Sequence, residues 1–151
     1  SMHASDPVNR IMSQPVHAIG ADEPLEEALR LFANHPVHHL PVVEGRHVVG
    51  MLSSADIAKV KFSLPPPGAA REALLKQRWH VRGVMRFPAI TVGEHESVQR
   101  AAELMADNGI HSLPVVDSND ALIGIVARRR PRHSNRPSLP GAPGTRPPSR
   151  W

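Results

Sequence analysis

Ser53, Ser54 and Asp56 stand directly after an apolar run, in the stretch VVGMLSSAD that spans residues 48–56. This change of residue type predicts that a strand ends here and a helix begins. The hydroxyl of Ser53 and the free N–H groups of a helix start favour an anion such as phosphate. Asp56, in the first turn, can accept two hydrogen bonds from vicinal hydroxyls such as those of a ribose. The alternative is that Ser53 and Asp56 only cap the helix, as these residue types commonly do.

The histidines of HPVHH, residues 35–39, are the other group that could do chemistry. A metal site is not favoured, because no carboxylate or cysteine lies nearby in the sequence and zinc takes three or four ligands. The chain also has no Gly-rich phosphate loop, no Gly-x-Ser-x-Gly and no His-Glu-x-x-His. Ser53 has no histidine close to it in the sequence to activate it. The sequence therefore predicts a protein that is not an enzyme and holds no metal.

Residues 11–43 and 84–116 are two copies of one pattern. Met12 falls on Met85, His38 falls on His111, and LPVV at 40–43 falls on LPVV at 113–116, always 73 residues apart. The offset becomes 74 after the next turn, where Gly50 meets Gly124. One unit of about fifty residues buries too little apolar surface to be stable alone. We therefore expect the two copies to pack together about a pseudo-twofold axis.

Each copy predicts a short strand, an amphipathic helix and a β-hairpin. The short apolar pieces are 16–19 and 89–92, and the helices have apolar residues at i, i+3, i+4 and i+7. The hairpins pair 40–43 with 47–52 and 113–116 with 121–126. A further helix is expected after residue 53, and the link 61–80 carries another short helix. The predicted fold class is α+β, with β-α-β-β(-α) repeats at 8–60 and 81–126.

This repeated order resembles a tandem pair of CBS domains, the Bateman module, over roughly residues 8–126. The resemblance is carried by Met12 and Pro15, by HHLPVV and HSLPVV, and above all by VVGMLSSAD. It implies a regulatory module that binds an adenosine compound, AMP, ADP, ATP or S-adenosylmethionine, between the repeats. The base would lie in an apolar slot and an Asp would hold the ribose. The resemblance also implies a homodimer and a regulated partner protein that the sequence does not identify.

The resemblance further implies two clefts, each with its Ser and Asp from one repeat and its adenine slot largely from the other. His38, His39 and His111 could contact phosphates, as basic residues at the 38 and 111 positions do in some relatives, or could stand half-exposed before strands with no ligand. The better cleft would combine Ser53, Asp56, Met85, Ala89, Ile90, Ile110, His111, Ser112 and Pro114. The second cleft would be lined by Met12, Val16, His17, Val37, His38, His39 and Pro41.

The second cleft departs from the family pattern in the stretch GIVARRR, residues 124–130. Ala127 offers no hydroxyl where Ser or Thr is expected, and Arg130 cannot accept a hydrogen bond from a ribose. The sequence therefore predicts one good cleft rather than two. It also predicts that the second repeat lacks its usual C-terminal helix motif.

The net charge of +4 is unevenly distributed along the chain. Residues 127–151 contain seven Arg, six Pro and no acid, so the rest of the chain has more acids than bases. This composition predicts a disordered tail, either native or produced by a shifted reading frame. The tail lacks the lysines, aromatics and helical period of a nucleic-acid arm, which argues against nucleic acid as a partner.

Two further properties of the composition bear on the cellular setting. The chain has no cysteine, which fits a reducing, cytoplasmic compartment. No apolar run approaches the roughly 20 residues that a membrane-spanning helix needs. A module that binds no ligand and serves only dimerisation or protein interaction is one alternative function, and nucleic-acid contact through the basic tail is another.

Overall fold

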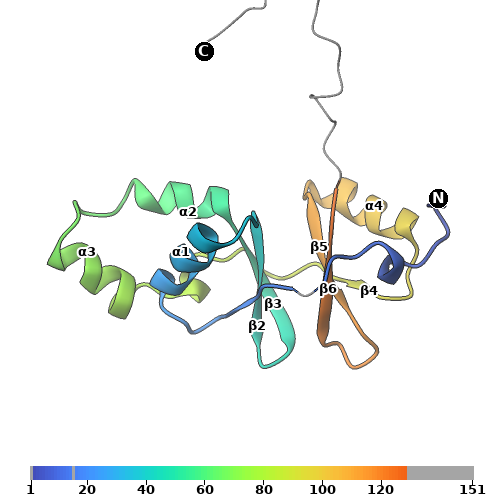
Figure 1. Ribbon diagram of the computed structural model, residues 1–151, viewed down its shortest axis with the longest axis horizontal. Helices are drawn as coiled ribbons and strands as arrows, with labels where there is room; N and C mark the ends of the chain where they lie inside the picture. Colours follow the sequence, from blue (N-terminus) through green and yellow to red (C-terminus); the bar gives the residue numbers. More distant parts are fainter. Residues whose placement is uncertain (1, 15, 129–151) are drawn as a thin grey trace, which may run out of the picture.

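The computed structural model describes residues 2–14 and 16–128, which form two lobes that correspond to the two sequence repeats (Figure 1). The first lobe contains α1, α2, α3 and the β2–β3 hairpin, and the second contains α4 and the β5–β6 hairpin. In chain order the elements are η1 (Val8–Arg10), β1 (Ile19–Gly20), α1 (Leu25–Asn34), β2 (His39–Glu44), β3 (His47–Ser53), α2 (Ser54–Lys61), α3 (Ala69–Ala73), η2 (Leu74–Arg78), η3 (Val81–Gly83), β4 (Val92–Gly93), α4 (Val98–Asn108), β5 (Ser112–Val116) and β6 (Leu122–Ala127).

Each lobe is built on a three-stranded sheet. β1 runs parallel to β2, which pairs antiparallel with β3, and β4, β5 and β6 repeat this topology. The register shifts at matching places, between Val42 and Val43 in β2 and between Val115 and Val116 in β5. The α+β fold of two like repeats is therefore confirmed. Helix α2 follows β3 in the first repeat, whereas no helix follows β6 in the part of the chain that the structure describes.

The helix boundaries follow from local sequence. α4 begins after Ser97, whose Oγ accepts a hydrogen bond from the backbone N–H of Arg100 at 3.0 Å. It ends at Gly109, which has φ 63°, a left-handed conformation that favours glycine. On its core side α4 buries Ala101 and Met105. The predicted link helix is present but is divided into the short α-helix α3 and the π-helix η2.

The first residues of each repeat pack into the core of the other repeat. Val8 of η1 is fully buried in the core of the second repeat, and Val81 of η3 is fully buried in the core of the first. The N–H of Val8 donates to the carbonyl of Glu96 at 2.8 Å, and the N–H of Val81 donates to the carbonyl of Glu23 at 3.0 Å. Because both pairs of positions are 73 residues apart, the exchange is reciprocal and the two lobes are related by an approximate twofold axis.

The segments 8–13 and 81–86, here called the leading segments, then run beside the last strand of the opposite hairpin. Met51 in β3 and Arg86 donate to each other's carbonyl at 3.0 and 2.8 Å. Ser13 and Ile125 in β6 form the equivalent pair at 2.8 and 3.2 Å. The first of these pairs fixes the backbone of Arg86 close to the end of β3, where the Ser53–Asp56 motif begins.

Gly50 is a position where this close approach requires a glycine. A Cβ at Gly50 would lie 2.6 Å from the Sδ of Met85 and 2.8 Å from the carbonyl oxygen of Arg86. A Cβ at Gly124 would have the Met12 side chain as its nearest contact, with Sδ at 2.5 Å. Backbone yields less readily than a flexible side chain, so we expect Gly50→Ala to lower the free energy of unfolding by about 1–3 kcal/mol and Gly124→Ala by less. Urea denaturation measures both, and equal losses in the two variants would contradict the prediction.

Candidate functional site

The junction between β3 and α2 holds Ser53 and Asp56 in a reciprocal capping arrangement. The backbone N–H of Asp56 donates to the Oγ of Ser53 at 3.1 Å, and the backbone N–H of Ser53 donates to the Oδ2 of Asp56 at 3.1 Å. Each side chain therefore satisfies a backbone donor at the helix start. The capping role that the sequence left open is realised, and it fixes the position of the Asp56 carboxylate.

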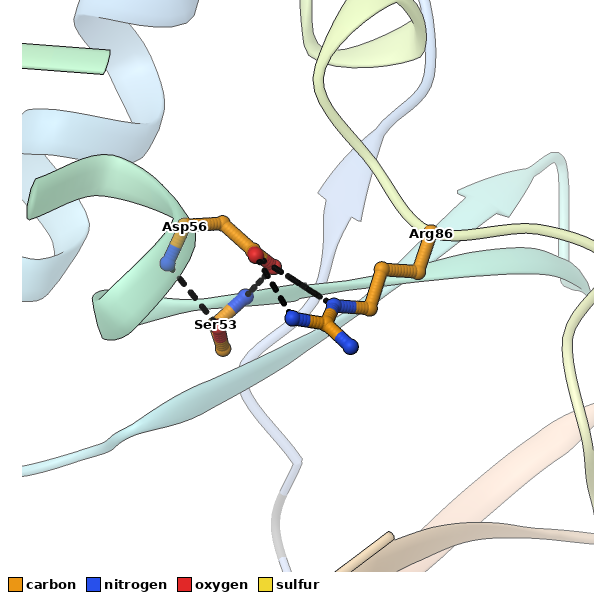
Figure 2. Close-up of polar contacts among 3 residues, drawn as sticks. All are labelled: Ser53, Asp56 and Arg86. Carbon is orange, nitrogen blue, oxygen red and sulfur yellow. Dashed lines mark hydrogen bonds and ion pairs between the residues drawn. The ribbon is translucent and has the colours of Figure 1, made fainter. Parts of the chain in front are cut away.

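Arg86 reaches the same carboxylate from the segment that leads into the second repeat (Figure 2). Its Nη2 donates to Asp56 Oδ1 at 3.2 Å, and its Nε lies 3.3 Å from Oδ1 and 3.4 Å from Oδ2. The side chain of Asp56 is only 10% exposed, whereas that of Arg86 is 64% exposed. A buried carboxylate from one repeat is thus paired with a guanidinium presented beside the other repeat.

The pKa of Asp56 reflects two opposing effects. Burial acts to raise this pKa, because it disfavours the charged carboxylate. Hydrogen bonds from the Arg86 guanidinium and from Ser53 stabilise the charged form and outweigh burial, so the pKa of Asp56 lies below its ordinary value of 3.8. Asp56 is therefore an anion at neutral pH.

The lowered pKa of Asp56 makes part of the folding free energy depend on pH. A carboxyl group with a depressed folded pKa contributes stability above its unfolded pKa and loses that contribution as the pH falls through the folded value. We expect the stability advantage of the parent protein over Asp56→Asn to be constant above about pH 5 and to shrink as the pH falls below the ordinary value near 3.8. Urea denaturation at stepped pH measures it, and an advantage unchanged between about pH 6 and pH 3 would contradict the assignment.

A cavity of about 490 Å³ lies against Asp56 and the start of α2. Its volume is within the range of small-molecule sites, about 300–1,000 Å³. Residues of both repeats form its wall, and seven of the nine residues predicted for the better cleft are among them: Ser53, Asp56, Ala89, Ile90, Ile110, His111 and Ser112. A second cavity of about 480 Å³, between α2 and η3, contains none of the predicted site residues.

Met85 and Pro114, the other two residues predicted for this cleft, do not line the cavity. Met85 packs against the first core and lies close to Gly50. Pro114 is fully buried within β5. Both are adjacent to the cleft in the chain, but their side chains belong to the packing behind its wall.

His38 and His39, which the family resemblance assigned to the second cleft, line this cavity. The antiparallel register explains their position, because His39 is paired with Ser53 across β2 and β3. The carbonyl of His38 also accepts a hydrogen bond from the N–H of Ser54 at 2.9 Å. The two histidines therefore stand at the same helix start as the predicted phosphate-binding hydroxyl.

The remaining residues predicted for the second cleft lie along the other half of the pseudo-symmetric pair. Met12 lies beside Gly124, and His17 stacks on His35 with the ring centroids 4.1 Å apart. Ala127 is the last residue of β6, and Arg130 lies outside the described residues, as does most of the predicted tail. Val16 and Val37 are partly buried, and Pro41 is fully buried.

Ser112 supplies a polar group on the cavity wall whose hydrogen-bonding capacity is unused. The residue is 4% exposed, and its Oγ has no hydrogen-bond partner among the described residues. Buried hydroxyls in native structures are normally hydrogen-bonded. The Oγ is itself almost inaccessible from the cavity, so this unsatisfied hydroxyl belongs to the packing behind the wall.

Sequence reasoning missed Arg86, Phe87 and Pro88, all of which line the cavity. They stand between Met85 and Ala89, which were both predicted for the cleft, and this adjacency was the available signal. The equivalent position in the first copy is Ser13, so the charge of Arg86 has no counterpart there.

The described residues form neither a metal-binding cluster nor a membrane-spanning helix. No group of three or more His, Cys, Asp or Glu within 2–14 and 16–128 is arranged to hold a metal ion. No helix in this part of the chain is both long enough and apolar enough to cross a membrane.

Comparison with known families accounts for both repeats. The CBS domain model matches residues 8–63 and 81–130, which correspond to the two sequence repeats. The chain belongs to the CBS domain family. It is a tandem CBS pair, which confirms the family that the repeated sequence pattern resembles.

Relatives of this CBS pair include both small and large proteins. A CBS domain-containing protein of Dictyostelium discoideum is 31% identical over 123 residues, which cover 80% of this chain and 85% of that protein. An inosine-5′-monophosphate dehydrogenase of Korarchaeum cryptofilum (strain OPF8) is 34% identical over 114 residues, 76% of this chain but only 21% of the dehydrogenase. The CBS pair therefore corresponds to nearly the whole of the first relative and to about a fifth of the second.

Two solved CBS structures resemble the pair and contain adenosine compounds. The CBS domain pair of protein MJ0100, in complex with 5′-methylthioadenosine and S-adenosyl-L-methionine, has a TM-score of 0.63 and 30% identity, and the match covers 80% of this chain and 88% of that chain. CBSX2 in complex with AMP has a TM-score of 0.66 and 25% identity, with 82% and 90% covered. Each match is longer than either lobe, so the likeness includes the way in which the two repeats pack.

Proposed function

We propose that this CBS pair is a regulatory module that binds an adenosine nucleotide in the cavity beside Asp56. The observation that carries the proposal is the buried, charged carboxylate of Asp56 on the wall of a ligand-sized cavity built by both repeats. The complexes of MJ0100 and CBSX2 support adenosine compounds as the ligand class.

The lining residues suggest how such a ligand would lie. The vicinal hydroxyls of a ribose would donate to the carboxylate of Asp56, which accepts hydrogen bonds only. The partly buried side chains of Ile90 and Ile110 offer apolar surface for the base. A phosphate would be placed towards Ser53 and Ser54, where α2 begins and its N-terminal dipole favours an anion. AMP, ADP, ATP and S-adenosylmethionine all carry the adenosine part.

The location of the cavity suggests how binding would be signalled. Its walls come from both repeats, so an occupant contacts both and changes the free energy of their packing. A ligand shifts a conformational equilibrium only by its difference in affinity for the two states. We infer that a partner protein distinguishes the ligand-bound from the ligand-free arrangement of the two repeats. We also infer that the module itself catalyses nothing.

Isothermal titration calorimetry of the full chain with AMP, ADP, ATP and S-adenosylmethionine tests the proposal. At least one of these should bind with a dissociation constant below about 1 mM, equivalent to about −4 kcal/mol. GMP serves as the control, because it keeps ribose and phosphate but changes the base. If none of the four adenosine compounds binds, or if GMP binds equally well, the assignment of the cavity fails.

Dimerisation is a second candidate function, favoured by Phe62 at the end of α2. Its side chain is 92% exposed, and contact with another chain would remove that apolar surface from water. We expect light scattering to give twice the monomer mass for the parent protein and a smaller mass for Phe62→Ser. A dimer that forms without any response to nucleotide would favour a purely structural module. A monomeric parent protein would exclude this second function.

A further inference from the structure

We propose that Arg86 determines the charge of the ligand that this cavity accepts, favouring a phosphorylated adenosine nucleotide over an adenosine compound with a cationic 5′ substituent. The inference rests on the proposed function above, because it concerns the same cavity. It adds a residue that competes with the ligand for Asp56 and then pairs with the ligand's phosphate. The argument comes from the contacts of Arg86, the exposure of the pair and the charges around the cavity.

Arg86 occupies the carboxylate that the ribose would need. Both oxygens of Asp56 are engaged, with Oδ2 accepting from the Ser53 N–H at 3.1 Å and both oxygens lying within 3.4 Å of the Arg86 Nε. The Ser53 contact is part of the capping arrangement that begins α2, so we expect it to persist when a ligand binds. A ribose diol therefore gains access to Asp56 by displacing the guanidinium.

The displaced guanidinium would remain at the cavity with its charge uncompensated. Among the described residues that line the cavity, Asp56 is the only carboxylate, whereas Arg86 is accompanied by His38, His39 and His111. Figure 2 shows the third guanidinium nitrogen, which contacts neither Asp56 nor Ser53, facing away from the carboxylate. The side chain is 64% exposed, so little packing holds it against Asp56 once that contact is broken. A ligand that carries its own anion would replace the lost partner of Arg86.

Phosphate meets this requirement better than the alternatives. A guanidinium binds phosphate through two parallel, charge-assisted hydrogen bonds. Adenosine offers no anion in exchange for the broken ion pair. S-adenosylmethionine places a sulfonium cation at the 5′ carbon, where a free arginine would repel it, and its one carboxylate stands beside an ammonium group several bonds from that position. The structure therefore orders the ligands, with AMP first, adenosine second and S-adenosylmethionine last.

Calorimetric titration of the full chain with AMP, adenosine and S-adenosylmethionine tests this order in the parent protein and in Arg86→Gln. Loss of a charge-assisted contact should weaken AMP binding at least roughly tenfold. Adenosine should bind Arg86→Gln as tightly as it binds the parent protein or more tightly, since Asp56 has lost its competitor. S-adenosylmethionine should gain affinity. Arg100→Gln, which removes an exposed arginine of α4 outside the cavity, is the matched control and should change none of the three.

If Arg86 selects the ligand, Arg86→Gln changes the affinities for AMP and adenosine in opposite directions. If Arg86 only supports the fold, both affinities fall together. Parallel loss of both ligands in Arg86→Gln would mean that Arg86 only supports the fold, and it would overturn the proposal. An unchanged ratio of AMP to adenosine affinity would overturn it as well, while leaving nucleotide binding itself in place. Failure of all adenosine compounds to bind the parent protein would overturn the proposed function and this inference together. Arg86→Lys should recover part of the AMP affinity, because it keeps the charge but not the paired hydrogen bonds.

Discussion

Val81→Asp is expected to unfold the first repeat, although Val81 lies in the segment that leads into the second. Its side chain is fully buried in the core formed around α1, β2 and β3. An unpaired charge in such a core costs at least about 3–5 kcal/mol, a large part of the roughly 5–15 kcal/mol that stabilises a typical domain. Because each core contains a segment from the opposite lobe, we expect both lobes to unfold in one transition. Circular dichroism during urea denaturation measures the loss.

Two matched variants make this test specific. Gly83→Asp introduces the same charge two residues further on, at a position where a Cβ would have no neighbour within 4 Å, and should leave stability nearly unchanged. Val8→Asp makes the equivalent change in the core of the second repeat and should destabilise the protein as strongly as Val81→Asp. If Val81→Asp melted only the second lobe, the reciprocal exchange would not couple the two repeats.

Asp56→Ala is expected to reduce affinity for adenosine nucleotides by at least about a hundredfold. Two hydrogen bonds from a ribose diol to a carboxylate contribute about 1.5–3 kcal/mol each, and the variant loses both. Calorimetry with the tightest-binding nucleotide measures the change.

The control for Asp56→Ala must separate ligand contact from helix capping. Asp56→Asn keeps the side-chain oxygen needed at the helix start and removes the negative charge, so it should retain most of the stability while losing most of the affinity. Asp107→Ala, at an exposed position of α4, should affect neither. Undiminished binding by Asp56→Asn would show that the charge of Asp56 does not hold the ligand.

The repeated pattern was sufficient to predict the architecture. Positions 73 residues apart carry the same signals, so the helix and hairpin of one copy supported those of the other. The strands and helices follow local sequence because the alternation of apolar residues and the Ser and Gly caps are local effects. The cleft that His38 and His39 line does not follow from local sequence. It depends on the strand register between β2 and β3, which pairs His39 with Ser53.

The ion pair at the candidate site shows where sequence reasoning stopped. Asp56 and Arg86 are 30 residues apart, and they meet only because backbone pairing of Met51 with Arg86 brings the second leading segment alongside β3. Nothing in either local sequence indicates that pairing. Ser112 is similar, because its unused hydroxyl is visible only once the surrounding atoms are placed. The polar residues of the motif were predictable, but their partners were not.

The reciprocal exchange of leading segments has a consequence for the order in which the chain can fold and for pieces cut from it. During synthesis, the strands and helices of the first repeat are complete at Lys61, yet its core lacks Val81 until the ribosome has passed η3. A fragment ending near residue 63 carries Val8 but has no Val81. Two such fragments can each lend η1 to the other, so an isolated first repeat is expected to assemble as a segment-swapped dimer rather than to persist as a folded monomer.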